Sequence, residues 1–279
     1  MPPTDRPVPS RPETREVSEL RALRVRQPEL APAVDMQLEL VELLRRLQAR
    51  VSTPTLPPVK ERQRRIGEGQ RVLDFADLPL DWPEVRLSAR QTADILHRYD
   101  LIDRADHASL VVLVREDADL MPAVRRWYSG EPANDGSPAP MLDELLPLAM
   151  RPFLARAVDV AQRGLDLSGW KRPSCPFCAG PPDFAVCLND DERLLICSRC
   201  SGRWPWDAVG CVWCLETRAA RLPTFLSTDR RYRVCACDSC RKYLKAYNAR
   251  GAARPVLPVV DLIATLPLDA AAAQRGYEG

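Results

Sequence analysis

Cysteine is the residue type with the clearest chemical pattern in this sequence. All ten cysteines of the 279-residue chain lie between Cys175 and Cys240, and eight of them form four Cys-x-x-Cys pairs. Two residues between cysteines allow a tight turn that directs both sulfurs at one ion, while backbone N–H groups donate to the thiolates. We therefore predict metal ligation by Cys175, Cys178, Cys197, Cys200, Cys211, Cys214, Cys237 and Cys240.

The spacing between the pairs indicates how they combine. Eighteen residues separate the first pair from the second, ten the second from the third, and twenty-two the third from the fourth. Two such turns joined by a hairpin of about 15–20 residues complete a tetrahedral sulfur site, which favours sequential pairing. A cross-braced arrangement, first with third and second with fourth, is the alternative. Four sulfurs suit zinc or a single iron, so two ions of either metal are expected.

Other uses of a dense cysteine set fit less well. A thioredoxin-like dithiol sits beside a βαβ unit, a pattern that this sequence lacks. A disulfide scaffold belongs to exported proteins, and no secretory signal is recognisable. The two remaining cysteines, Cys187 and Cys235, are interpreted as small buried apolar residues, with Cys235 as an alternative ligand beside Cys237.

The sequence gives no sign of an enzyme. It has no Gly-rich phosphate loop and no G-x-S-x-G motif, and its two histidines, His97 and His107, lie far along the chain from the cysteines. A metal held by four cysteines has no open position for water or substrate. We therefore expect no catalytic residues, and sites that hold structure or at most pass electrons.

Charge and hydropathy argue against nucleic acid and membrane. Net charge is +2, and eight arginines are balanced by eight carboxylates between residues 175 and 240. A phosphate-binding surface needs a basic excess. No stretch approaches the roughly 18 apolar residues that span a bilayer. We expect a soluble cytoplasmic protein that neither binds nucleic acid nor inserts into a membrane.

Helices should position the cysteine region. Apolar periodicity predicts helices over residues 34–51, 88–102, 105–114 and 122–128, and from 141 to 165 with a break near Pro147 and Pro152. A capping-box pattern of Ser88 and Gln91 places one helix start at Ser88. The segment SLVVLV (109–114) could also form a strand, but its flanks are helix formers.

The abrupt onset of cysteine marks the domain boundary. The fold class expected is α+β, a mostly helical N-terminal domain followed by two small rubredoxin-like or zinc-ribbon-like β modules. The predicted parts are a disordered tail (1–16), the helical domain (17–168) with an exposed loop at 129–140, a first four-cysteine ribbon (169–208), a second four-cysteine ribbon (209–250) and a partly helical C-terminal tail (251–279).

Several runs around the cysteines resemble one known family. They are WKRPSCPFC (170–178), LLICSRCSGRW (194–204), CVWCLE (211–216), CDSCRKYLK (237–245), and the closing DLIATLPLD (261–269) and QRGY (274–277). Together they are similar to the formate dehydrogenase accessory proteins of the FdhE type. The resemblance spans about 170–277 and departs at Ala179, where the family has glycine, and at Ala208, where it often has a positive charge.

The resemblance implies a cytoplasmic maturation factor that carries rubredoxin-like iron. Its partner would be the molybdenum-containing catalytic subunit of formate dehydrogenase, whose assembly or activation such proteins assist. Two other functions remain open. A rubredoxin-like electron carrier would show a reversible Fe(III)/Fe(II) couple, and a zinc-ribbon nucleic-acid adaptor, the weakest option on charge, would show salt-dependent binding.

Overall fold

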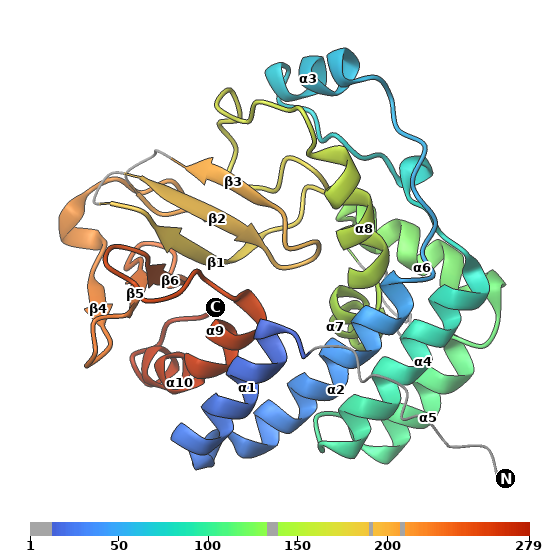
Figure 1. Cartoon of the computed structure of the whole chain (residues 1–279), viewed down its shortest axis with the longest axis horizontal. Helices are drawn as coiled ribbons and strands as arrows, with labels where there is room; N and C mark the ends of the chain where they lie inside the picture. Colours follow the sequence, from blue (N-terminus) through green and yellow to red (C-terminus); the bar gives the residue numbers. More distant parts are fainter. Residues whose placement is uncertain (1–12, 133–138, 190–191, 207–209) are drawn as a thin grey trace, which may run out of the picture.

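The chain consists of a helical N-terminal half, a single β-sheet and two short C-terminal helices, as Figure 1 shows. The structure is a computed structural model, and it describes residues 13–132, 139–189, 192–206 and 210–279. This arrangement confirms the α+β class, with helices first and cysteine-bearing β modules after them.

Eight α-helices lie before the cysteines in the described part of the chain. In order they are α1 (Arg15–Arg26), α2 (Ala31–Gln48), α3 (Val59–Gly67), α4 (Trp82–Arg98), α5 (Arg104–Leu113), α6 (Asp117–Ser129), α7 (Ala139–Ala149) and α8 (Arg151–Ala161), with 3-10 turns η1 (Pro28–Leu30) and η2 (Phe75–Asp77).

The predicted helices are present, and SLVVLV lies mostly in α5 rather than in a strand. The predicted break falls at Met150, between α7 and α8. Pro147 lies inside α7, whereas Pro152 occupies the first turn of α8. N–H groups in the first turn have no acceptor within the helix, so proline is tolerated there. Helices α1 and α3 were not predicted. Helix α3 buries only Arg62 and Ile66, so it has almost no apolar stripe.

The capping box at Ser88 was a wrong prediction. Helix α4 begins at Trp82, with Pro83 in its first turn, so Ser88 lies in mid-helix. Its side chain is buried, and its hydroxyl donates to the Ala149 carbonyl oxygen at 2.6 Å. Since the hydroxyl has a tertiary partner, local sequence could not reveal its role.

The segments predicted as irregular are described only in part. Of the tail 1–16, residues 1–12 lie outside the described residues, and α1 begins at Arg15. Of the loop 129–140, residues 133–138 lie outside them, and α7 begins at Ala139.

Both β modules contribute to one six-stranded sheet of order β3-β2-β1-β6-β5-β4. The first supplies β1 (Pro182–Cys187), β2 (Arg193–Cys197) and β3 (Arg203–Trp206), and the second supplies β4 (Thr224–Leu226), β5 (Tyr232–Ala236) and β6 (Tyr243–Asn248). All pairings are antiparallel except the central one, where β1 runs parallel to β6. The predicted ribbons are therefore joined along β1 and β6.

Different helices pack against the two faces of the sheet. One face places Ala185, Leu195, Trp204 and Ala246 in the same buried cluster as the helices α4 to α8. The opposite face is packed by α9 (Pro258–Ala264) and α10 (Leu266–Gln274), and α9 also contacts α1. The central strands β1 and β6 are buried along most of their length, whereas burial alternates along β3 and β5 and β4 is largely exposed.

Candidate metal centres

The four Cys-x-x-Cys turns, termed knuckles, share one backbone conformation. In each, the residue directly after the second cysteine has a positive φ of 58–60°, in the left-handed region that side chains with a Cβ seldom adopt. These four residues are Ala179, Ser201, Leu215 and Arg241. The repeat shows that the four turns are one structural element used four times.

A closed pair of hydrogen bonds stabilises each knuckle. In the first, Cys175 N donates to Gly180 O and Ala179 N donates to Cys175 O, both at 2.9 Å. The other three knuckles repeat this pattern at 2.8–3.1 Å. The left-handed residue reverses the chain, and so allows both bonds to form around the two cysteines.

Backbone N–H groups also point at the sulfurs. Phe177 N and Arg199 N each lie 3.4 Å from the Sγ of the cysteine two residues before, and Trp213 N lies 3.3 Å from Cys211 Sγ. Gly202 N lies 3.4 Å from Cys200 Sγ. Such donors favour thiolate over thiol, which is the form that binds a metal.

The knuckles bring the eight cysteines together in two groups of four. The first centre is Cys175, Cys178, Cys197 and Cys200, and the second centre is Cys211, Cys214, Cys237 and Cys240; within each, the sulfurs lie within 4.8 Å of one another. This is the sequential grouping, not the cross-braced one.

The distances between sulfurs suit a tetrahedral ion. Neighbouring sulfur pairs are 3.5–3.6 Å apart in both centres. A tetrahedron with metal–sulfur bonds near 2.3 Å has sulfurs about 3.8 Å apart, whereas a disulfide needs about 2.05 Å. None of the ten cysteines forms a disulfide. Both groups therefore fit a divalent ion with four cysteine ligands.

Electrostatics in the first centre also fit a cation. Burial raises the pKa of the Cys175 and Cys200 thiols, whereas hydrogen bonds from neighbouring cysteines lower the pKa of Cys178. Four buried thiols without a positive charge cannot all ionise, because like charges repel strongly at low dielectric. A bound divalent ion would remove that repulsion and favour all four thiolates.

The first centre is embedded in the helical domain. Its four cysteines are at most 2 % exposed and lie in the main core with Phe177 and Trp204. The segment between α3 and η2 binds the first knuckle: Val72 N donates to Pro176 O at 2.8 Å, and Leu73 N donates to Phe177 O at 3.0 Å. We call Val72–Leu73 the strap. It joins parts of the chain about a hundred residues apart, and no local sequence pattern marks it.

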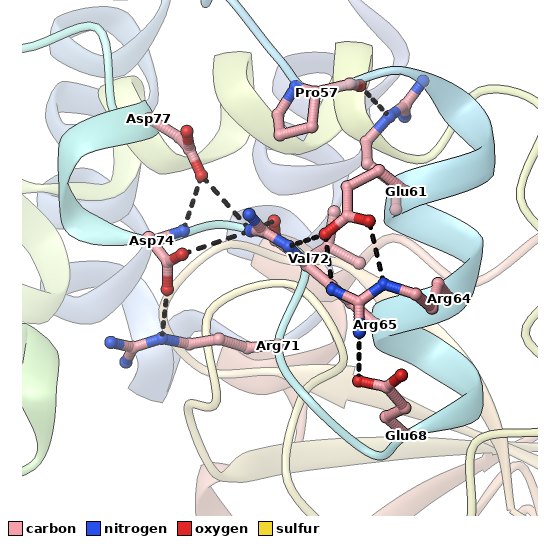
Figure 2. A network of polar contacts seen from close by, with 10 residues as sticks. Pro57, Glu61, Arg64, Arg65, Glu68, Arg71, Val72, Asp74 and Asp77 are labelled. Carbon is pink, nitrogen blue, oxygen red and sulfur yellow. Dashed lines mark hydrogen bonds and ion pairs between the residues drawn. The ribbon is translucent and has the colours of Figure 1, made fainter.

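Charged side chains fix the strap, as Figure 2 shows. Arg65 on α3 donates to Val72 O at 3.0 Å and to Asp74 at 3.2 Å, and lies 3.7 Å from Asp77. Asp77 in turn accepts from Asp74 N at 2.8 Å. Arg71 lies 3.6 Å from the second oxygen of Asp74. Arg65 thus connects α3 to the strap that binds the first knuckle.

The second centre lies nearer the surface. Cys214 is exposed, Cys240 is half-buried, and Leu215 beside them is 60 % exposed. The fourth knuckle, which contains Cys237 and Cys240, contacts the C-terminal segment of the chain. Arg241 donates to Gly276 O, and Tyr243 N donates to Glu278 O. Glu278 N also donates to Arg241 O at 2.7 Å, so a backbone segment binds this centre too, but it comes from the C-terminus and not from the helical half.

The remaining candidates lie outside both groups. Cys187 on β1 and Cys235 on β5 belong to neither set of four sulfurs, and burial raises the pKa of Cys235. His97 and His107 stack at 4.6 Å between α4 and α5, and His107 Nε2 lies 2.8 Å from Asp94. Neither histidine adjoins a sulfur group in the described part of the chain.

A solved structure, that of the FdhE protein from Pseudomonas aeruginosa, matches nearly the whole chain. The match covers 96% of this chain and 94% of that one, at 24% sequence identity and a TM-score of 0.59. The chain has the fold of that FdhE protein. No protein-family model matches this sequence. No curated protein matches it either.

The FdhE match extends the resemblance that the knuckles carried. The sequence runs cover residues 170–277, whereas the FdhE fold includes the helical half as well. None of the described helices is long and apolar enough to cross a membrane.

Proposed function

We propose that this protein is an FdhE-type accessory factor for formate dehydrogenase. In this proposal it acts in the cytoplasm, binds the molybdenum-containing catalytic subunit and assists its assembly or activation. The observation that carries the proposal is the FdhE fold over 96% of the chain, together with four knuckles in the order that the family motifs have. Fold alone does not fix function, so the sequence runs around the knuckles are an essential second support.

The two centres would each hold one ion, with iron favoured and zinc as the alternative. The ligands would be the eight paired cysteines, whose spacing and N–H donors suit a four-sulfur site. A bound ion supplies positive charge and a rigid crosslink, and iron would add a one-electron couple. The residues of the chain position the strands: the knuckles fix the ends of β1, β2, β5 and β6, and so hold the sheet against the helices.

The role we propose is not catalytic. Four cysteines occupy all four coordination positions of a tetrahedral ion, so no position is open for substrate. Recognition of the partner is then the task of surfaces around the centres. A rubredoxin-like electron carrier remains the second candidate, because Cys214 is exposed and an iron there would be near solvent.

Affinity purification from the native host under anaerobic conditions tests the proposal. We expect tagged protein to recover the catalytic subunit of formate dehydrogenase, and a Cys211→Ser/Cys214→Ser double variant to lose it. Recovery of a redox enzyme, together with a reversible iron couple, would favour the electron carrier. Recovery of nucleic-acid machinery alone would contradict both.

A further inference from the structure

Arginines stacked on aromatic rings cover the surface beside the first centre. The guanidinium of Arg125 lies 5.0 Å from the ring centroid of Phe75, and that of Arg71 lies 4.9 Å from the ring of Tyr128. The two rings are themselves 5.8 Å apart. Stacking fixes a guanidinium by its face and leaves the N–H groups on its edge available to an acceptor.

A third arginine joins this surface from the second knuckle. Arg199, between Cys197 and Cys200, lies 4.4 Å over the ring of Trp127. Its Nη1 and that of Arg71 both lie 3.4 Å from Tyr128 O. Two guanidiniums therefore converge on one carbonyl oxygen next to the metal ligands.

Carboxylates are scarce around these arginines. Asp74 lies 3.6 Å from Arg71 but also pairs with Arg65, as Figure 2 shows. Arg125 and Arg199 have no carboxylate within 4.0 Å in the described part of the chain. Since like charges held close together repel, this geometry favours an anionic ligand from outside.

An apolar groove of about 470 Å³ adjoins the arginines. Its charged lining is Arg125 and Asp74, and Asp74 is paired with Arg65 and Arg71. Met121, one turn before Arg125 on α6, is 37 % exposed. The charged network of Figure 2 fixes η2, which carries Phe75 into the groove. The apolar lining is Phe75, Ala76, Leu78, Leu80, Trp82 and Met121.

We propose that this groove and its arginines are the docking site for an acidic segment of the partner protein. An apolar side chain of that segment would fill the groove, and neighbouring carboxylates would bind Arg125, Arg71 and Arg199. Arginine and aromatic residues dominate binding energy at protein interfaces. The inference rests on the proposed function, since the partner is then the formate dehydrogenase catalytic subunit.

A second arginine-lined groove provides a matched control. It has a volume of about 530 Å³, lies between α4 and α5, and contains Arg86, Arg90 and Arg115. There Arg86 pairs with Asp117, and no arginine of that groove is stacked on a ring within the described residues. Its lining residues include none from the knuckles.

Binding of the full-length, metal-loaded protein to purified catalytic subunit tests the site. We expect Arg125→Glu to weaken binding at least about tenfold, Arg125→Lys to weaken it less, and Met121→Asp to weaken it through the groove. Arg90→Glu should bind like wild type. Unchanged circular dichroism and two bound ions in each variant show that the fold is intact.

The outcomes separate this inference from the proposed function. If wild type does not bind the catalytic subunit, the proposed function fails. If wild type binds and Arg125→Glu and Met121→Asp bind equally well, the function stands and this docking site is wrong. Binding of a single-stranded oligonucleotide that is lost in Arg125→Glu, without binding of the subunit, would reassign the arginines to nucleic acid.

Discussion

The two metal centres use the same knuckle in different surroundings. Cys178 of the first centre is fully buried, whereas Cys214, at the equivalent position of the second, is exposed. The first centre is bound to the helical half by the strap, and the fourth knuckle, in the second centre, contacts the end of the chain. The same local geometry is therefore placed in two tertiary contexts, one enclosed by the core and one close to solvent.

Removal of one ligand from each centre should give the largest difference. Loss of a structural ion removes about 10 kcal/mol or more of folding free energy, which matches the whole stability of a typical domain, about 5–15 kcal/mol. We expect Cys178→Ser to unfold the sheet and its contact with the helices. Cys211→Ser should disorder the third knuckle and the chain around it, keeping one ion and the helical circular dichroism. Metal analysis and thermal melts distinguish the two, and equal melts would contradict the comparison.

Release of metal to a chelator should separate the centres without mutation. We expect two phases of metal release with equal amplitude, and the faster phase should come from the second centre. The two rates should differ by more than about tenfold. A tenfold difference corresponds to only ~1.4 kcal/mol in the free energy of local opening. A chromophoric chelator reports both phases. The Cys211→Ser variant serves as the control, because it should lack the fast phase. A single phase from the intact protein would show that burial does not govern release.

The sequence predicted the centres better than their surroundings. A knuckle is local, so the spacing of the cysteine pairs was enough to predict which sulfurs lie together, and the helical half and the α+β class were confirmed. The strap, the parallel pairing of β1 with β6 and the exposure of Cys214 depend on residues distant in sequence. No periodicity or spacing carries that information, and Ser88 shows how a local pattern fails when a tertiary partner exists.

The strap should be weakened by a change at Arg65. Arg65→Ala removes the bonds to Val72 O, Asp74 and Asp77, so we expect a loss of about 1–3 kcal/mol in urea unfolding. Metal release from the first centre should become faster, while that from the second is unchanged. Arg64→Ala is the matched control, because Arg64 pairs with Glu61 and Glu68 on the surface of α3 and makes no bond to the strap. Equal effects of the two variants would show that the contacts of Arg65 with the strap do not stabilise the first centre.

The smallest effect should come from the left-handed residues. Ala179→Gly and Leu215→Gly each remove a Cβ from a backbone with φ near 60°, and glycine adopts this conformation without strain. After the entropy cost of glycine, we expect a gain of about 0.5–1 kcal/mol. The opposite change, Gly180→Ala, would place a Cβ 2.8 Å from Arg199 Cδ and should destabilise the first centre.

The two glycine variants should differ in where the gain is seen. Ala179 belongs to the centre that we expect to unfold with the main core, so its replacement should raise the global melting temperature. Leu215 belongs to the centre that we expect to open locally, so its replacement should slow the fast phase of metal release and leave the melting temperature unchanged. If both variants change the melting temperature, or both change the rate of the fast phase, the two centres unfold as one unit.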